Sequence, residues 1–520
     1  MSSSTRHSLP KVHTSQASLP LALYSADGVR NLDRYLIDEQ GISGFELMQT
    51  AARNAFRQLL RRWPDTRSIL VLCGAGNNGG DGYLLAKYAV YQGLKVKCLA
   101  LTEPSKLQGD AHQAWQAAQT QKVSISLSTQ LTDRELSAEL QHADVTVDAM
   151  LGTGLEGAPR GEFARVIALC NRAAHTVLAL DLPSGLNASS GAAAGDVVDA
   201  AATVTFIGLK TGLFTGQGPA VCGDIVFADL NTTAQLQDCR EPVRATRADW
   251  GSCAAQIAKR RANAHKGHFG HVLVVAGDYG FGGAALLVAE AAARSGAGLV
   301  SLATRPEHVT AALSRCPSVM SHGIVQDDEL APLLAAATVI VCGPGLGQGA
   351  WGRQLLQQVL DCSKPLVLDA DALNLIAAQG ALASNTHILT PHPGEAARLL
   401  GLSVAEIESD RFAAARQLQA QYGGTIVLKG AGTLIAGADD QLSLVNGSNP
   451  GMACGGMGDV LAGITAGLWA QMADPEQAAI TAAALHLAAA NSAAKQFGFM
   501  SLQPTDVIEA LPQVLADAGF

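Results

Sequence analysis

Several apolar runs in the first half of the chain end in residues that could bind a phosphorylated ligand. One run is followed by GAGNNGGDG, in which Gly74, Gly76 and Gly79 form a G-x-G-x-x-G pattern. Such glycines let a dinucleotide approach the backbone, and the N–H groups of the following helix bind its diphosphate. We place the start of that helix near Tyr83. A plain dinucleotide turn does not explain the two adjacent amides or the acid at Asp81.

Two further runs end in hard oxygen ligands. DAMLGTGLEGAPRG places Asp148 at the end of one run, and DLPSGLN places Asp181 and Ser184 at the end of another. Together with the amides of Asn77 and Asn78, these oxygens could coordinate a hard cation beside a phosphate. Asn and Gly can also merely shape turns, because both tolerate the left-handed conformation. Three such turns in one domain favour a binding site.

An NAD-dependent dehydrogenase is the plainest alternative for this half of the chain. Glu103 follows the next apolar run, roughly where a ribose-binding acid would lie. A lone G-x-G-x-x-G is weak evidence, however, and leaves the other turns unexplained.

The second half carries the sequence NPGMACGGMGDVLAGITAG. Gly455, Gly456 and Gly458 precede Asp459, and a helical run follows at Val460. Free N–H groups at a helix start can hold a transferring phosphoryl group, and Asp459 could accept a hydroxyl proton as that group arrives. The loop is not a Walker A loop, since no G-K-[ST] follows the glycines. The alternative is a glycine-rich contact between helices, with Asp459 interacting with the helix dipole.

Other motifs of this half also follow apolar runs. LKGAGTLI reads as a strand, a glycine turn and a second strand, in which Lys429 and the turn amides suit nucleotide phosphates. TPHPGE fixes His392 between two prolines, and GPGLGQ, residues 343–348, forms another turn.

These turns are positioned by apolar runs that alternate with Ala- and Leu-rich helical stretches. The alternation predicts an α/β fold of two doubly wound domains, with ligands at the carboxyl ends of parallel strands. A polar, aperiodic stretch near residues 231–249 is the best linker. We therefore divide the chain into a disordered tail (1–23), a first domain (24–235), a linker (236–247) and a second domain (248–520).

Composition excludes several functions. The net charge is −9 with no long basic run, which argues against a nucleic-acid partner. No apolar run reaches the roughly 18 residues of a membrane helix. The ten cysteines are scattered, which argues against a zinc ribbon or a disulfide framework and favours a cytoplasmic protein.

The motifs GNNGGDG, DAMLGTG, DLPSGLN and TFIGLKTGL resemble those of the NAD(P)H-hydrate epimerase domain, from about residue 24 to residue 230. The resemblance implies a Rossmann-like domain that binds a hydrated dinucleotide as its substrate. It also implies a potassium ion held by Asn78, Asp148 and Ser184. We assign the acid/base role to Asp181. The implied substrate contacts are Asn77, Asn78, Gly79, Gly80, Asp81, Gly152, Thr153, Gly154, Leu155, Glu156, Gly157, Ala158 and Asp181.

The second half resembles the ADP/ATP-dependent NAD(P)H-hydrate dehydratase domain, a ribokinase-like fold, over roughly 248–511. The resemblance implies ADP or ATP with Mg²⁺. Cys454 stands where that family leads us to expect a small polar residue. The implied substrate contacts are Ala284, Gly347, His392 and Asp459, and the implied nucleotide contacts are Lys429, Gly430, Ala431, Gly432, Thr433 and Gly458.

The whole chain thus resembles the bifunctional NAD(P)H-hydrate repair enzymes. We expect epimerisation of R- and S-NAD(P)HX and then nucleotide-dependent dehydration of S-NAD(P)HX to NAD(P)H, in a homo-oligomer. One alternative is a vitamin-precursor kinase fused to a dinucleotide-binding regulatory domain. Another is a scaffold whose first domain has lost catalysis, which the intact NNGGD and Asp181 argue against.

Overall fold

The computed structural model describes residues 19–520 except 381, 383–385 and 440, and these form two compact units. The N-terminal unit ends at residue 245, and the C-terminal unit begins at residue 246. Residues 1–18 of the expected disordered tail (1–23) lie outside the described residues. Its last residues are not a tail, because Ala22–Tyr24 forms strand β1 and Leu23 is fully buried.

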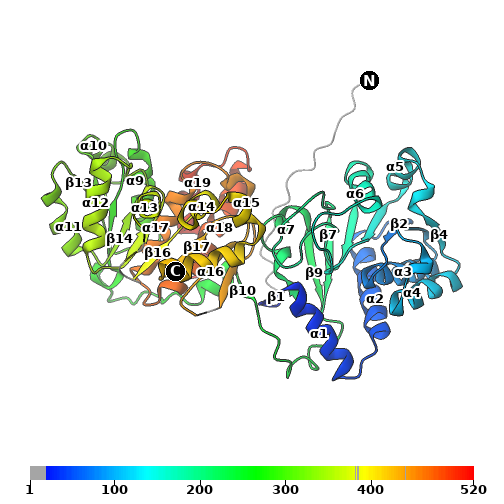
Figure 1. The fold of residues 1–520 in the computed structure, drawn as a ribbon. Coiled ribbons are helices and arrows are strands. Elements are labelled where there is room, and N and C mark those ends of the chain that lie inside the picture. Colours follow the sequence, from blue (N-terminus) through cyan, green and yellow to red (C-terminus); the bar gives the residue numbers. More distant parts are fainter. Residues whose placement is uncertain (1–18, 381, 383–385, 440) are drawn as a thin grey trace. The chain divides into compact units, whose positions relative to one another are not determined.

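The N-terminal unit is built on a seven-stranded parallel sheet in the order β4-β3-β2-β5-β6-β7-β9 (Figure 1). This order, which runs outward from β2 in both directions, is that of the Rossmann fold. A separate short parallel pair joins β1 to β8. The strands are β2 (Ser68–Cys73), β3 (Lys95–Ala100), β4 (Ser124–Leu127), β5 (Val145–Ala149), β6 (Val177–Leu180), β7 (Ala202–Phe206), β8 (Leu209–Lys210) and β9 (Asp224–Ala228).

Helices cover both faces of this sheet, and strand β2 shows why its sequence is apolar throughout. Ile69 and Val71 pack into one core cluster with α1 to α4, whereas Leu70 and Leu72 pack into a second cluster with α5 and α6. A strand buried on both faces needs no polar side. The helices are α1 (Ala26–Asp38), α2 (Gly44–Arg62), α3 (Asn77–Tyr91), α4 (Gly109–Thr120), α5 (Asp133–His142), α6 (Glu162–Ala173) and α7 (Gly218–Val221).

The C-terminal unit has a larger sheet in the order β13-β12-β11-β14-β15-β16-β17-β18-β19-β10. Its strands run parallel from β13 to β17, and β17, β18 and β19 then form an antiparallel meander. The strands are β10 (Ala245–Ala248), β11 (His271–Val275), β12 (Leu299–Thr304), β13 (Met320–Gly323), β14 (Val339–Cys342), β15 (Leu366–Leu368), β16 (His387–Leu389), β17 (Thr425–Leu428), β18 (Thr433–Ala436) and β19 (Leu442–Val445).

The helices of this unit again surround the sheet. The main core cluster joins Val272 and Val274 of β11 to α9, α17, α18 and α19. Helix α17 packs tightly on α9, since a Cβ at Gly463 would lie 2.4 Å from the Val288 carbonyl oxygen. The helices are α8 (Trp250–Ala254), α9 (Gly282–Arg294), α10 (Pro306–Arg315), α11 (Ala331–Ala336), α12 (Ala350–Asp361), α13 (Asp371–Gln379), α14 (Pro393–Leu400), α15 (Val404–Ser409), α16 (Arg411–Tyr422), α17 (Met457–Trp469), α18 (Pro475–Phe497) and α19 (Pro504–Asp517).

The prediction of two doubly wound α/β domains is therefore confirmed. Within the described part of the chain, no helix combines the length and the apolar character needed to cross a membrane.

Candidate functional site

The glycine-rich turn after β2 leads directly into α3, which begins at Asn77. Our placement of the helix start near Tyr83 was therefore wrong by more than a turn. Glycines are poor helix formers, but here close packing outweighs propensity. A Cβ at Gly79 would lie 2.1 Å from the Gly74 carbonyl oxygen, and one at Gly74 would lie 1.8 Å from the Met150 carbonyl oxygen.

The N-terminus of α3 presents free backbone donors. Its N-cap is Gly76, and no described side chain caps the first turn. The first N–H groups of a helix have no partner within the helix and carry the positive end of its dipole. This end of α3 can therefore bind the diphosphate of a dinucleotide.

The structure brings the three predicted cation ligands together around Leu151. Ser184 Oγ lies 2.6 Å from Asp148 Oδ1, and the Leu151 N–H donates to Ser184 Oγ at 2.8 Å. Asn78 Nδ2 donates to the Leu151 carbonyl oxygen at 3.0 Å. The sequence-based expectation that these side chains converge from three strand ends is met by this geometry.

The chemistry of this group fits a hard cation. Asn78 Oδ1 is buried and has no hydrogen-bond partner among the described residues. Burial raises the pKa of Asp148 to about 6, although hydrogen bonds from Ser184 and Met150 oppose the rise. A cation would compensate both the orphaned oxygen and the buried carboxylate. Amide, hydroxyl and carboxylate oxygens suit a hard ion and do not suit zinc.

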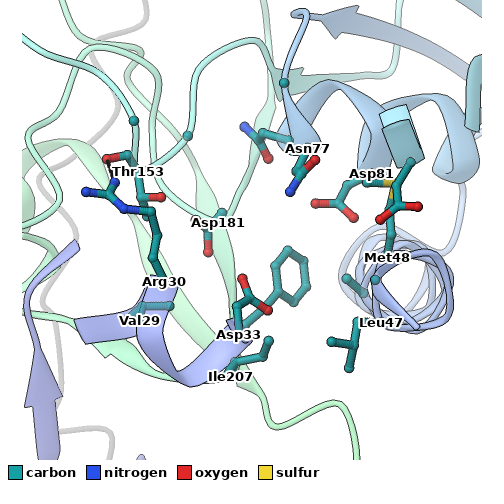
Figure 2. A pocket seen from close by; sticks show the side chains of 18 of the residues that line it. Val29, Arg30, Asp33, Leu47, Met48, Asn77, Asp81, Thr153, Asp181 and Ile207 are labelled. Atoms are coloured by element: carbon teal, nitrogen blue, oxygen red, sulfur yellow. Dashed lines mark hydrogen bonds between the residues drawn. The ribbon is translucent and has the colours of Figure 1, made fainter. Parts of the chain in front are cut away.

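A cavity of 760 Å³ opens beside this group and is the candidate epimerase site (Figure 2). Helix α1, the start of α3 and the turn after β5 all contribute to its walls. Residues 152–156 line it, as do Asn77, Asn78, Asp81 and Asp181. The other implied contacts, Gly79, Gly80, Gly157 and Ala158, are not among its described lining residues, and Gly80 packs against Met48.

Asp181 pairs with a lysine to which the sequence analysis assigned no role. Its carboxylate forms an ion pair with Lys210, whose side chain is 1% exposed. Lys210 Nζ also donates to Thr205 Oγ1 at 3.0 Å. Asp181 has a φ of +66°, and Ile207, just before β8, has a φ of +64°. Left-handed backbone at a non-glycine residue is uncommon and often marks a functional site.

Two further carboxylates face the same cavity. Burial raises the pKa of Asp81 well above its ordinary value, and the charges of Asp181 and Asp33 add to the rise. Burial also raises the pKa of Asp33 to about 6, while Lys210 opposes the rise and Asp181 adds to it. Figure 2 shows the carboxylates of Asp33, Asp81 and Asp181 turned toward the same space.

In the C-terminal unit, the predicted residues follow the carboxyl ends of neighbouring parallel strands. Gly347 lies beyond the end of β14, His392 beyond β16 and Lys429 directly after β17. Asp369 follows β15 between them, and a Cβ at Gly343 would lie 1.9 Å from its carbonyl oxygen. Our sequence reading overlooked Asp369, although the run PLVLDADAL ends in an acid just as the other runs do.

Helix α17 begins at Met457, so Gly458 and Asp459 lie in its first turn rather than before it. Gly456 caps the helix with a φ of +96°, a conformation that glycine adopts at little cost. No side chain among the described residues caps this end. The N–H groups of the first turn are therefore free to bind a phosphoryl group.

A cluster of charged side chains lies beside this helix start. Lys429 Nζ lies 2.7 Å from Asp369 Oδ1 and 3.7 Å from Glu395 Oε2. A Cβ at Gly458 would come within 3.2 Å of the same ammonium group. His392 caps α14, and its Nε2 lies 3.4 Å from Glu395 Oε1. The structure thus brings Lys429, Gly458 and His392 into one region with Asp369 and Glu395.

The charged groups of this cluster shift one another's pKa values. Burial raises the pKa of Asp459 to about 7, with Asp369 adding to the rise and Lys429 opposing it. Burial lowers the pKa of Lys429, but Asp369 and Glu395 outweigh that effect and raise it overall. Burial and the nearby Lys429 lower the pKa of His392. The lysine therefore stays charged, whereas Asp459 titrates near neutral pH, as suits a general base.

The remaining implied contacts lie in the first turn of α9 and in two strand-end turns. Ala284 belongs to α9, and a Cβ at Gly345 would lie 3.3 Å from the Ala284 Cβ. The Gly347 N–H donates to Asp371 Oδ2 at 2.9 Å. The turn of residues 430–432 contains Gly430 and Gly432 at positive φ, and leads into β18, which begins at Thr433. Arg411 supports this turn with hydrogen bonds to the Leu428 and Lys429 carbonyl oxygens.

Comparisons with known proteins decide the family. A family model described as YjeF-related protein N-terminus matches residues 44–212, and one described as NAD(P)H-hydrate dehydratase matches residues 272–513. A bifunctional NAD(P)H-hydrate repair enzyme of Coxiella burnetii is 45% identical over 490 residues, which cover 94% of this chain and 98% of that protein. The chain belongs to the family of bifunctional NAD(P)H-hydrate repair enzymes. The family resemblance seen in the motifs is confirmed.

A second full-length relative agrees with this assignment to the NAD(P)H-hydrate repair enzymes, and part of the chain is also similar to a solved structure. The repair enzyme of Escherichia coli strain K12 is 40% identical over 511 residues, covering 98% of this chain and 96% of that protein. A solved ADP/ATP-dependent NAD(P)H-hydrate dehydratase from Bacillus subtilis, co-crystallised with ATP and Mg²⁺, is 32% identical. It covers 51% of this chain and 96% of its own, with a TM-score of 0.47.

Proposed function

We propose that each unit carries out one half of the repair reaction. The N-terminal unit interconverts R- and S-NAD(P)HX, and the C-terminal unit dehydrates S-NAD(P)HX to NAD(P)H with ADP or ATP. The observation that carries this division is that each unit has its own polar site at the carboxyl ends of its own parallel sheet. The family membership supplies the substrates and the bifunctional activity.

In the N-terminal unit, the start of α3 would hold the diphosphate of NAD(P)HX and the cavity would hold its hydrated ring. A volume of 760 Å³ is within the range of small-molecule sites. Asp181, charged against Lys210, lies at the cavity wall and would exchange protons with the ring.

Potassium would be held by Asn78, Asp148 and Ser184. The unpartnered oxygen of Asn78 and the buried carboxylate of Asp148 support this assignment. When bound, the ion would offset negative charge beside the diphosphate. The Leu151 backbone accepts a hydrogen bond from Asn78 Nδ2 and donates one to Ser184 Oγ. These bonds connect the turn after β5 to the start of α3.

In the C-terminal unit, Asp459 would remove the proton of the substrate hydroxyl as its oxygen attacks the terminal phosphoryl group. The free N–H groups of α17 and the ammonium group of Lys429 lie where they would stabilise the transferring charge. Phosphorylation converts a poor leaving group into a good one, so elimination of phosphate then restores the double bond.

The turn 430–432 and Lys429 would bind the phosphates of the nucleotide, with Mg²⁺ shielding the charge between them. Gly430 and Gly432 have positive φ and no side chain, so a ligand can approach the backbone of this turn closely. Ala284, Gly347 and His392 would contact the hydrated dinucleotide from the adjoining strand ends. The Cys454 thiol donates to two backbone carbonyl oxygens, at 3.7 and 3.8 Å, as a hydroxyl group could, so its place in the position of a small polar residue should matter little.

We further propose a cytoplasmic location and a homo-oligomeric state. All ten cysteines are free thiols, which supports a reducing compartment. The oligomeric state is supported by the family resemblance and is measured by light scattering of the purified chain.

The test of the proposed function is to incubate the protein with mixed NADHX or NADPHX epimers and each nucleotide, and to follow the absorbance of the reduced ring. We expect both epimers to disappear and NAD(P)H to form. A vitamin-precursor kinase would instead leave the hydrates intact, and in a parallel assay with ATP and pyrimidine or thiazole alcohols it would yield a stable phosphorylated alcohol.

A further inference from the structure

Helix α1 forms one wall of the epimerase cavity, and this wall lies outside the residues that the family model matches. The match begins at residue 44, whereas α1 spans Ala26–Asp38. Asp33 is in the middle of this helix and lines the cavity. Figure 2 shows its carboxylate pointing into the cavity, across from that of Asp181.

The two facing carboxylates have different surroundings. Asp181 is paired with the buried ammonium group of Lys210, so its negative charge has a fixed counterion. Among the described residues, Asp33 forms no ion pair with that lysine, and burial raises its pKa to about 6. Two carboxyl groups held in unlike environments are a common arrangement for an acid and a base in one site.

The substrate's chemistry calls for such a pair. Water adds to an enamine by protonation of the β-carbon and attack of oxygen on the carbon next to nitrogen. The hydrated carbon therefore carries a hydroxyl group and a bond to the ring nitrogen. Opening of that bond gives an aldehyde, and closing on the other face of the aldehyde gives the other epimer. Opening removes the hydroxyl proton and adds a proton to nitrogen.

Resting on the proposed epimerase function, we propose that Asp33 is the general acid that works with Asp181 as the base. Asp181 takes the hydroxyl proton, the C–O bond becomes a carbonyl, and the electrons of the C–N bond move to nitrogen, which takes the proton of Asp33. After rotation, nitrogen attacks the other face of the carbonyl carbon and returns its proton to Asp33. The new oxygen anion recovers the proton from Asp181, so no co-reactant is consumed.

Asp81 is the competing acid, because it lines the same cavity. It lies in the first turn of α3 among the glycines, and its Oδ1 has no hydrogen-bond partner among the described residues. Burial raises the pKa of Asp81 well above its ordinary value. Asp81 lies at the helix end that would hold the diphosphate, whereas Asp33 lies across the cavity from Asp181, so we assign substrate hydrogen bonding to Asp81 and proton transfer to Asp33.

A general acid must be protonated, so epimerisation should slow as the pH rises above about 6, the pKa of Asp33. The charge of Lys210 opposes this pKa rise, and that of Asp181 adds to it. The other charged or titratable groups that line the cavity are Arg30, Arg34, Asp38, Asp81, Asp110 and Glu156.

The test compares Asp33→Asn with Asp33→Glu, Asp81→Asn and the matched control Asp27→Asn, all in the full chain. Asp27 lies on the same helix with an 81% exposed side chain and outside the cavity. Each variant is assayed for epimerisation of R-NADHX across pH 5 to 9, and for dehydration of S-NADHX. Dehydration reports that the C-terminal unit is intact, and the thermal unfolding transition of the N-terminal unit, which carries the substitutions, reports that this unit is folded.

We expect Asp33→Asn to lower kcat for epimerisation by about 10²–10⁴-fold, with KM and dehydration little changed. The decline above about pH 6 should vanish in this variant and return in Asp33→Glu. Asp81→Asn should raise KM more than it lowers kcat. Full epimerase activity in Asp33→Asn would overturn the inference while leaving the proposed function intact. Absence of epimerisation in the unmodified chain would instead refute the proposed function.

Discussion

Lys429 Nζ lies 2.7 Å from Asp369 Oδ1, and a Cβ at Gly458, in the first turn of α17, would lie 3.2 Å from the same Nζ. This contact joins two strand-end loops to the helix that carries Asp459. The lysine can stay charged because the carboxylates of Asp369 and Glu395 compensate its burial. The positive charge is thereby held beside free N–H groups, in the arrangement that a transferring phosphoryl group needs.

The first prediction concerns Asp459 as the base of dehydration. Asp459→Ala should lower the dehydration rate by about 10²–10⁴-fold and leave epimerisation unchanged. Because a base must be ionised and the pKa of Asp459 is about 7, dehydration by the unmodified chain should fall as the pH drops below 7. Stopped assays of S-NADHX with nucleotide measure both effects. A variant with full dehydratase activity would falsify the role.

The second prediction concerns the influence of Asp369 on that base. Asp369→Asn removes a negative charge that raises the pKa of Asp459, and it also leaves Lys429 less neutralised. Both changes favour ionised Asp459, so the acidic limb of the dehydration profile should move to lower pH. The measurement is kcat/KM against pH for both proteins. A limb that stays in place or moves to higher pH would show that Asp369 does not act on Asp459.

The third prediction concerns potassium. Replacing K⁺ by a large organic cation should slow epimerisation and lower the unfolding temperature of the N-terminal unit, because bound ligand stabilises the folded state. Asp148→Ala should make both properties insensitive to K⁺, with dehydration unaffected. Calorimetry in paired buffers measures the stability effect. Equal K⁺ dependence in Asp148→Ala and the unmodified chain would place the ion elsewhere.

The fourth prediction compares two glycines at the start of α3 that differ in how closely other atoms pack against them. A Cβ at Gly79 would lie 2.1 Å from a backbone oxygen, whereas a Cβ at Gly76 would meet nothing within 4 Å. Gly79→Ala should therefore destabilise the unit by about 1–3 kcal/mol or more. Gly76→Ala should cost less, about 0.5–1 kcal/mol, because Gly76 is the N-cap of α3 and glycine is favoured over alanine there. Similar unfolding temperatures for the two variants would show that the turn tolerates a Cβ at Gly79.

Much of this architecture could be predicted from the sequence. The central parallel strands are buried and apolar on both faces, so their runs could be read from the sequence, and the polar residues that end them lie at one edge of each sheet. Asp148, Asp181, His392 and Lys429 were found in this way. The part-exposed edge strands β4 and β13 could not be read in this way. The helix starts at Asn77 and Met457 were misplaced, because glycine propensity argues against helix and only tertiary contacts reveal why glycine is required there.

The residues that were missed are those whose role depends on folding. Asp33 lies on an ordinary amphipathic helix, and nothing local indicates that this helix covers the cavity. Lys210 stands within the quoted motif TFIGLKTGL, but its ion pair with Asp181, 29 residues earlier in the chain, is visible only in the folded structure. In the sequence, Glu395 can be recognised only as part of the cap at the start of α14. Its proximity to Lys429 becomes visible only in the folded sheet, where the two strands that precede these residues lie side by side.

The division of labour between the two units is tested most directly by supplying pure R-NADHX or pure S-NADHX with nucleotide to Asp181→Asn. R-NADHX can be repaired only after epimerisation, whereas S-NADHX enters the dehydratase site directly. Our expectation is that Asp181→Asn restores NADH from S-NADHX at the rate of the unmodified chain, and from R-NADHX only at the uncatalysed epimerisation rate. Equally fast repair of both epimers by Asp181→Asn would contradict it.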